Sequence, residues 1–595
     1  MCWLALVTAI MQTVAPPAPS EDSIQLIRRQ ARRAEMEYES LLRRLAPATV
    51  GSGGSGQCDE VVGRFCLRFS AGPEPPILPE VGRVTRARWE AVDALRRAFA
   101  LQPGELSTAA PLVRYLVEGD RAPEAISAAE AFAWASGDPV WGPAVMAFAY
   151  HANGQDSTAE RHFASALAAM DEQTRERFTW VEALLDNDES RLYRSLKGAE
   201  REAYEAVLWR AADPLYLTAE NEAWVEHLAR GVWVWMLSRA PVVSGMYRWG
   251  KDLEELTLRY GPPAGRKREV GMNLGELRMI EQFDPEQLPF VPPELRRQGL
   301  PAAPLPGEPS PLEATRVRSA HMPRTVRRVI PITHQASRFP RGDSILVRLD
   351  GALVLDSVAR DVREQAGRNV PRLTTGLFVL DADFHKLAEV RGEIRAHRDT
   401  ILVSHALMVD RNVRNYSLEV IEGVTRLAGR ARHPIDPDLP SSGGLALSDL
   451  LVAHPFGEGR RPTGPLSPEL HALPELVLPT GAEIGLYAEV HGLEADESGT
   501  TAYRVTLSVQ APDGPALARA ARWLGRRLGL AGPGYEPELS WEATGDGIGP
   551  EIIAIDLDLT GLRPGLHWIE LVVADLVAGT EVQTSRPILI RDAGH

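Results

Sequence analysis

The hydrophobic positions of the chain follow a helical period in its first half and an alternating period in its second. Between Glu21 and Ala46, apolar residues recur at helical spacing among mixed charges, which predicts an exposed amphipathic helix. From Arg86 onward, equivalent positions recur every 34 residues, first as Ala91, Ala125 and Ala159 and then as Ala98, Phe132 and Ala166. A period of this length predicts pairs of antiparallel helices that stack on one another.

The last of these units carries the most complete repeat pattern, with residues Tyr150, Gly154, Ala159, Phe163 and Ala166. With them the region resembles tetratricopeptide repeats, in which small residues let two helices pack closely. The earlier units depart from that pattern, because Gly82 and Leu116 stand where the family has an aromatic residue. The resemblance implies a helical array over residues 86–208 that serves as a docking platform. Generic antiparallel helices are the alternative.

The second half alternates apolar and polar residues with a period of two. Short β-type runs separated by Gly, Asp and Asn turns fill residues 328–456, and a second set fills residues 474–595. Pro-rich segments at 284–327 and 457–473 precede the two sets and are typical of linkers. Runs with this spacing predict antiparallel sandwiches, and we expect the run Leu445 to Phe456 to close the first one.

These patterns together predict an α+β multidomain chain. N-terminal α-helical, tetratricopeptide-like repeats are followed by two antiparallel β-sandwich modules. The length of 595 residues suits three or four domains at roughly 150 residues each. The divisions are a signal segment at 1–20, an N-terminal helix with a cysteine hairpin at 21–85, helical repeats at 86–208, a junction region at 209–283, a linker at 284–327, a sandwich at 328–456, a linker at 457–473 and a sandwich at 474–595.

The junction region contains the change from one period to the other. Leu256, Leu258 and Tyr260 alternate with polar residues, which predicts a half-buried strand. The sequence Gly261-Pro262-Pro263 would end that strand, because proline offers no N–H and restricts the residue before it. Upstream, Thr218 is the expected N-cap of a helix, with Asn221 three residues later.

The residues from Trp209 to Gly265 resemble the GWxTD-domain proteins, a family named for a short motif that precedes a strand and a Tyr-Gly-Pro-Pro turn. Trp249 and Asp252 keep two positions of the motif, whereas Arg248 and Lys251 replace its Gly and Thr. The resemblance implies an extracytoplasmic bacterial protein of unknown function. It also implies helical repeats before the motif and strand-rich segments after it.

The candidate binding residues are those of the motif and the turn after it, namely Trp249, Asp252, Tyr260, Gly261, Pro262 and Pro263. We interpret this set as structural. Trp249 is expected to pack as a core aromatic, and Asp252 to cap a turn or to bond the indole N–H. Ligand binding by the same residues is the alternative, and the set shows no arrangement typical of catalysis.

The N-terminus indicates a compartment. Met1 to Ile10 forms an apolar run of signal-peptide length, too short to span a bilayer, and a polar, Pro-rich stretch follows it. We therefore expect export to the periplasm or cell envelope, the alternative being a cytosolic chain with an apolar first turn. In an oxidising compartment, Cys58 and Cys66 suit a disulfide that closes a small hairpin, and two buried free thiols are the alternative.

Charge and motif content narrow the function classes. The formal net charge of -15 argues against a nucleic-acid partner, because affinity for phosphate backbones comes from clustered Lys and Arg. The 14 histidines are scattered, and neither a zinc motif nor a dinucleotide fingerprint occurs, so we expect no metal and no cofactor. A Ser-His-Asp triad stays open, because only the fold would bring its members together.

The sequence thus favours a non-enzymatic binding or scaffold protein of the cell envelope, with protein partners there and no transmembrane span. One alternative is an enzyme with its site between the helical half and the first sandwich, for which Asp252, Arg259 and Tyr260 are the candidates. Another is the binding of carbohydrate or a surface polymer by the sandwiches, which would need exposed aromatic residues on one face, and the candidates Tyr487, Trp541 and Trp568 are few for that.

Overall fold

The structure, a computed structural model, divides into two compact units. Unit 1 comprises Met1–Trp180 and Val225–Asp284, and unit 2 comprises Val181–Trp224 and Pro285–His595. The structure describes residues 20–45, 48–50, 60–63, 65–67, 79–240, 249–263, 265–270, 277–282, 288–289, 302–310, 320–321, 326, 328–355, 372–395, 399–423, 426–442, 444–457, 459–511 and 538–592.

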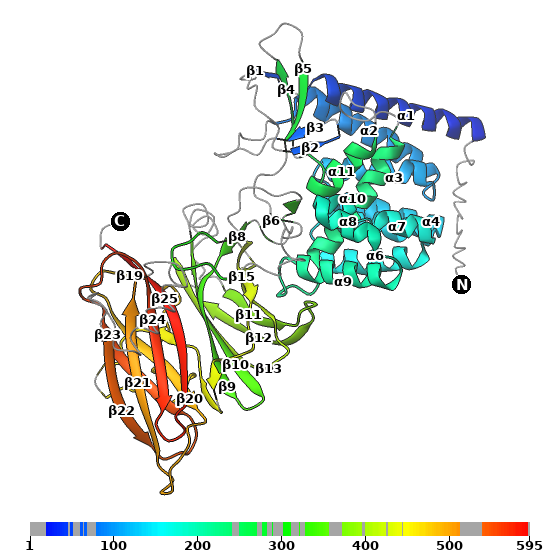
Figure 1. The fold of residues 1–595 in the computed structure, drawn as a ribbon. Coiled ribbons are helices and arrows are strands. Elements are labelled where there is room, and N and C mark those ends of the chain that lie inside the picture. The colour runs from blue at the N-terminus through cyan, green and yellow to red at the C-terminus, as the bar shows by residue number, and fades with distance from the viewer. Residues whose placement is uncertain are drawn as a thin grey trace, which may run out of the picture. The chain divides into compact units, whose positions relative to one another are not determined.

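Unit 1 is mainly helical (Figure 1), and its helices are α1 Glu21–Arg44, α2 Gly82–Leu101, α3 Leu106–Glu118, α4 Ala122–Ser136, α5 Trp141–Ala152, α6 Asp156–Ala169, α7 Glu172–Phe178, α10 Glu222–Arg239 from Val225 onward, and α11 Lys251–Tyr260. Helices α2 to α6, blue to cyan in Figure 1, each pack against the next. The predicted amphipathic helix at the start of the chain is confirmed as α1.

Small residues at the 34-residue period explain how these helices approach one another. Ala91, Ala125 and Ala159 lie in α2, α4 and α6, and each is 0% exposed. The period therefore spans two helices. Gly137 and Gly154 follow α4 and α5 with φ values of 60° and 72°, a region that favours glycine and ends a helix without strain.

Short strands complete unit 1, namely β1 Ala48–Val50, β2 Glu60–Val62, β3 Phe65–Leu67, β4 Gly265–Val270 and β5 Leu277–Gln282. Strands β2 and β3 form an antiparallel hairpin in which Val61 lies opposite Cys66. Cys58 and the side chain of Cys66 lie outside the described residues, so the predicted disulfide stays a prediction. The predicted signal segment also lies outside them.

Unit 2 begins with helical residues, which are the 3-10 helix η1 Glu182–Leu184 and helices α8 Asn187–Ser195 and α9 Ala199–Ala212. Its strands are β6 Leu288–Pro289, β7 Ala320–His321, β8 Arg328–Pro331, β9 Thr333–Arg341, β10 Ser344–Val354, β11 Arg372–Leu380, β12 Lys386–Arg395, β13 Thr400–Asp410, β14 Asn415–Glu422, β15 Leu427–Pro434, β16 Ser441–Ser442, β17 Leu445–Leu447, β18 Leu451–Ala453, β19 Val477–Pro479, β20 Glu483–His491, β21 Thr501–Gln510, β22 Glu538–Gly545, β23 Glu551–Asp558, β24 Gly565–Asp575 and β25 Glu581–Arg591. The chain is therefore α+β, with helices first and antiparallel-rich sheets after them.

Two apolar cores hold the large sheets of unit 2. The sheet β13-β10-β9 and the sheet β12-β11-β14-β15-β8 share a core that includes Val347, Leu377 and Leu418, each 0% exposed. The sheet built on β20 and the sheet β19-β25-β24-β21-β22 share a second core, which includes Ile484 and Ile569. Inward-facing apolar residues at period two produce both cores, as the alternating pattern predicts.

Two predicted elements need correction. The run Leu445 to Phe456 does not close the first strand set, because it splits into β17 and β18, both of which pair with β20. Residues 256–260 form the end of helix α11, not a strand. Leu253, Leu256, Thr257 and Tyr260 are all buried at a spacing of three and four residues, which is the helical period.

Candidate functional site

The motif residues lie at the two ends of α11. Trp249 precedes the helix and is half-buried, so it is less buried than a core aromatic. Asp252 lies in the first turn, where its Oδ1 accepts a hydrogen bond from the N–H of Leu253 at 3.0 Å. A carboxylate in the first turn also interacts favourably with the positive end of the helix dipole. Gly63 in the β2–β3 turn approaches Asp252 closely, since a Cβ on it would lie 2.4 Å from the Cβ of Asp252.

Gly261, Pro262 and Pro263 follow the last turn of α11. Gly261 has φ 75° and ψ -171°, a conformation that is essentially restricted to glycine. Pro262 and Pro263 are half-buried. The Gly-Pro-Pro pattern correctly predicts the end of an element at residue 260, but that element is helix α11 and not the predicted strand.

Arg230 on α10 holds this end of α11. Its Nη1 donates to the carbonyl oxygens of Leu258 at 3.1 Å and Arg259 at 2.9 Å. Carbonyl groups in the last turn have no partner within their own helix, so a buried guanidinium satisfies them and balances the negative end of the dipole. The side chain of Arg230 also lies against Gly261, where a Cβ would come within 3.2 Å of Nε.

A buried chain of charges links Arg230 to the helical array. Arg230 Nε donates to Glu226 Oε1 at 2.5 Å, and Glu226 Oε2 lies 2.7 Å from His151 Nε2. The other ring nitrogen of His151 lies 2.6 Å from Asp156 Oδ1. Burial favours the neutral imidazole, but the carboxylates of Asp156 and Glu226 outweigh it and raise the pKa of His151.

This chain of contacts positions helices α5, α6, α10 and α11 relative to one another. His151 is 3% exposed, and both of its ring nitrogens are already bonded. Arg259 is 0% exposed and donates from Nη2 to the hydroxyl of Tyr260 at 3.2 Å, and Tyr260 is also buried. Each of these side chains is therefore buried and hydrogen-bonded within the protein.

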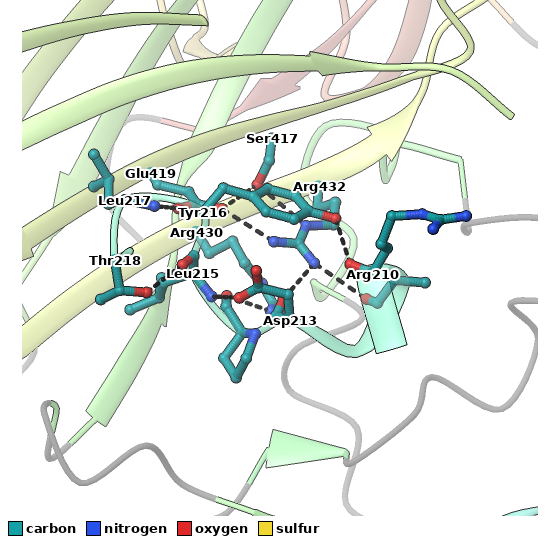
Figure 2. A network of polar contacts seen from close by, with 12 residues as sticks. Arg210, Asp213, Leu215, Tyr216, Leu217, Thr218, Ser417, Glu419, Arg430 and Arg432 are labelled. Atoms are coloured by element: carbon teal, nitrogen blue, oxygen red, sulfur yellow. Dashed lines mark hydrogen bonds and ion pairs between the residues drawn. The ribbon is translucent and has the colours of Figure 1, made fainter. Parts of the chain in front are cut away.

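A second polar cluster surrounds residues 209–222 of unit 2, which we call the docking segment (Figure 2). Arg432 on β15 donates to the carbonyl of Asp213 at 2.7 Å and to Glu419 Oε1 at 3.1 Å. Its guanidinium stacks 4.1 Å above the ring of Tyr216, and that stacking together with Glu419 and Asp213 outweighs burial and raises the pKa of Arg432.

The backbone of the docking segment is bonded to the sheet residue by residue. Glu419 Oε2 accepts from the N–H of Leu217 at 3.0 Å, and Arg430 donates to the carbonyl of Pro214 at 2.8 Å. Tyr216 and Leu217 also pack against Phe378 of β11. Buried backbone groups require partners, and the strands β14 and β15 supply them.

The helix after this segment starts differently from the prediction. Asn221, not Thr218, is the N-cap of α10, because its Oδ1 accepts from the N–H of Trp224 at 3.0 Å. Thr218 instead donates to the carbonyl of Leu215 at 2.6 Å. Glu222, the first residue of α10, is 0% exposed, and burial, with the nearby carboxyl of Asp213, raises the pKa of Glu222.

Several of these residues carried a signal that the sequence reading missed. Glu419 is an acidic residue inside an apolar strand run, and such a residue needs a buried partner. Arg430 and Arg432 alternate with small residues and thus face the same side of one strand. Glu226 and Arg230 are four residues apart on a helix, a spacing typical of an ion pair.

The structure adds two observations on sites and membranes. Within the described ranges, no group of three or more His, Cys, Asp or Glu side chains is arranged to hold a metal ion. Among the helices that the structure describes, none combines the length and the apolar character that a membrane crossing requires.

Comparisons with known proteins assign no family to the chain. No family model matches it, and no curated protein does. Among solved structures, the crystal structure of Bacteroides uniformis beta-glucuronidase is similar over 41% of this chain and 26% of that one, at 11% sequence identity and a TM-score of 0.16. A likeness at that score does not establish a shared fold, and this chain matches about a quarter of that enzyme's length.

Proposed function

We propose that this chain is a non-enzymatic binding or scaffold protein of the cell envelope. The observation that carries the proposal is Trp134 on α4, which is 89% exposed. The opposite face of the same helix is packed, since Ala125, Ala129 and Phe132 are each 0% exposed. Tryptophan is among the residue types enriched at binding hot spots, and at 89% exposure its ring is accessible to a partner.

The polar clusters support the same proposal. The Asp156–His151–Glu226–Arg230 chain satisfies the end of α11, and Arg432 satisfies the docking segment. Groups of this kind rigidify a scaffold. We take helices α2 to α6 to be tetratricopeptide-like repeats, the two cores of unit 2 to mark two β-sandwich modules, and the motif region to be GWxTD-like. None of these three assignments is needed for Trp134 to bind a partner.

The carbohydrate-binding alternative meets an obstacle in unit 2. Tyr487 is 0% exposed and donates its hydroxyl hydrogen to Glu489 Oε1 at 2.9 Å. Trp541 and Trp568 are half-buried, and Trp541 packs against the second core. Sugar-binding surfaces need aromatic faces that a sugar ring can stack on, and Tyr487 supplies none as it is placed.

A site-specific crosslink tests the proposal. A photo-crosslinking amino acid at position 134 of the full chain, in the cells that produce it, should give one reproducible protein adduct, identified by mass spectrometry. The matched control is Ile548, which is also apolar and 84% exposed but lies in the loop between β22 and β23. Absence of an adduct at 134, or the same adduct from both positions, would refute a binding surface on α4.

Export is a separate part of the proposal and has its own test. Cell fractionation should place the mature chain outside the cytoplasm. Mass spectrometry of non-reduced peptides should then show Cys58 linked to Cys66, as an oxidising compartment allows. Free thiols in protein isolated under thiol-blocking conditions, together with a cytoplasmic location, would contradict export.

A further inference from the structure

Helix α1 packs on the helical array mainly through its second half. Ala31, Tyr38 and Leu42 in its second half are buried, whereas most of the residues before Ala31 are exposed, and Leu26 there is 51% exposed. The packed half lies against α2 and α3. The first half adds one partly exposed ion pair, Arg28 to Glu105 at 2.6 Å, so the buried contacts that hold α1 lie in its second half.

Those residues are charged as well as apolar. Glu35 and Glu39 on α1 are 7% and 2% exposed, and they face Arg114 and Tyr115 on α3, which are 1% and 0% exposed. Arg114 pairs with Glu39, and Tyr115 donates to Glu39 Oε1 at 3.1 Å. A buried charge stays in place only while its partners balance it.

The remaining charges at the contact come from α2, α3 and the residue Glu80 before α2. Tyr38 donates to Glu118 Oε2 at 2.9 Å and accepts from Arg88 Nε at 3.0 Å. Arg88 also pairs with Glu80, and Arg114 Nε lies 3.5 Å from Glu118 Oε1. The guanidinium groups of Arg88, which is half-buried, and Arg114, which is buried, are therefore already shared by three other carboxylates. These five groups carry one negative charge in excess, and an ionised Glu35 would add a second.

Burial raises the pKa of Glu35 to about 7; Arg114 opposes this shift, Glu39 adds to it, and Arg32 opposes it. The neighbouring tyrosine and arginine side chains do not change charge in the same pH interval. Burial raises the pKa of both Tyr38 and Tyr115 above an already high ordinary value, so they stay neutral. The arginine side chains stay protonated.

We propose that α1 is a pH-dependent latch, which closes on α2 and α3 while Glu35 is neutral and opens when Glu35 ionises. In the open state Glu35 is in water, with an ordinary pKa of 4.5, against about 7 in the closed state. The closed state is therefore most stable below pH 4.5, weakens as the pH rises towards 7, and stays weak above it. This difference between the two pKa values lowers the equilibrium constant for closing roughly a hundredfold between pH 4.5 and pH 7. Opening exposes Tyr115 and Arg114.

Hydrogen exchange of the full chain between pH 5 and pH 8.5 tests the latch. After correction for the intrinsic pH dependence of amide exchange, protection of the peptides within residues 31–44 should fall by up to about a hundredfold. Peptides from β24 serve as an internal reference and should keep constant protection. In Glu35→Gln, protection of α1 should be independent of pH and higher than in the wild type at pH 8.

Glu37→Gln is the matched control, because Glu37 lies on the same helix but is exposed, and it should keep the wild-type profile. Constant corrected protection of α1 in the wild type would overturn the proposal, and this measurement needs no variant to fold. A parallel loss in α2 and α3 would also overturn it, because ionisation would then unfold the array instead of releasing α1.

Discussion

At the scale of single residues, the interior of this protein uses charge to fix backbone. Arg432 and Arg230 each donate to main-chain carbonyls and to one carboxylate, and both are buried. Replacement of a buried pair by apolar residues can be neutral, but loss of one member leaves the other charge uncompensated. Loss of either arginine should therefore destabilise the fold, because a buried carboxylate would lose its charge partner.

Arg432→Met should lower the free energy of unfolding of unit 2 by about 3–5 kcal/mol, because it leaves Glu419 buried without its partner. Denaturant unfolding monitored by tryptophan fluorescence measures the loss. The control is Arg504→Met, which breaks an exposed pair with Glu542 and should cost less than about 1 kcal/mol. Equal effects of the two variants would show that Arg432 does not hold the docking segment.

Acid should destabilise unit 2 through His334. Burial, with the nearby charge of His433, lowers the pKa of His334 to about 3, and its Nε2 bonds the hydroxyl of Tyr416 at 2.6 Å. The folded pKa lies below the ordinary 6.5, so the stability is full above pH 6.5 and is lost as the pH falls towards 3. Between pH 6.5 and pH 5 the loss should be about 2 kcal/mol.

Urea unfolding at pH 6.5 and pH 5 measures this change in the free energy of unfolding with pH. His334→Phe should be less stable at neutral pH, because it loses the bond to Tyr416, but its stability should change little with pH. His454→Phe, at an exposed position, should retain the wild-type slope. A wild-type slope in His334→Phe would mean that another group takes up the proton.

At the scale of elements, the junction between the two periods depends on how α11 ends. The apolar residues 256, 258 and 260 fit a strand and a helix equally well. Leu253, three residues before Leu256, adds the helical spacing that distinguishes a helix from a strand. The sequence predicted the stop at Gly261 correctly because proline and glycine chemistry is local. It did not predict Arg230 as the group that satisfies this helix end, because that contact joins two elements.

Gly261→Ala should destabilise unit 1 by about 1–3 kcal/mol, because alanine is strained at φ 75°, ψ -171° and its Cβ would press on Arg230. Thermal unfolding followed by circular dichroism measures the change. Gly82→Ala, at the start of α2 with nothing within 4 Å of the added Cβ, should be neutral or slightly stabilising. A stable Gly261→Ala variant would show that the turn tolerates another backbone conformation.

At the scale of the whole molecule, the strand-rich unit recruits helical residues from the first half of the chain. The sequence predicted the order of helices and sheets, because periodicity is read locally. It could not predict that residues 181–224 belong with the strands, since the bond from Leu217 to Glu419 crosses 202 residues. Pairing of β17 and β18 with β20 was missed for the same reason.

The two units should unfold separately in a calorimeter, because each has its own core. Arg432→Met should lower the midpoint of one transition by several degrees, and Gly261→Ala should lower only the other. Peptide-resolved hydrogen exchange at intermediate temperature assigns each transition to its unit. A single transition that both variants shift together would show one cooperative body.

The docking segment also has a consequence for how the chain is made. Leu215, Tyr216 and Leu217 leave the ribosome well before Glu419, their anchor 202 residues later in the case of Leu217. At about 5–20 residues per second, the wait is roughly 10–40 s. During that time three apolar side chains and their unpaired backbone groups face water. A chaperone that binds short apolar segments would find its target there, and it would have to let go once β14 and β15 are complete.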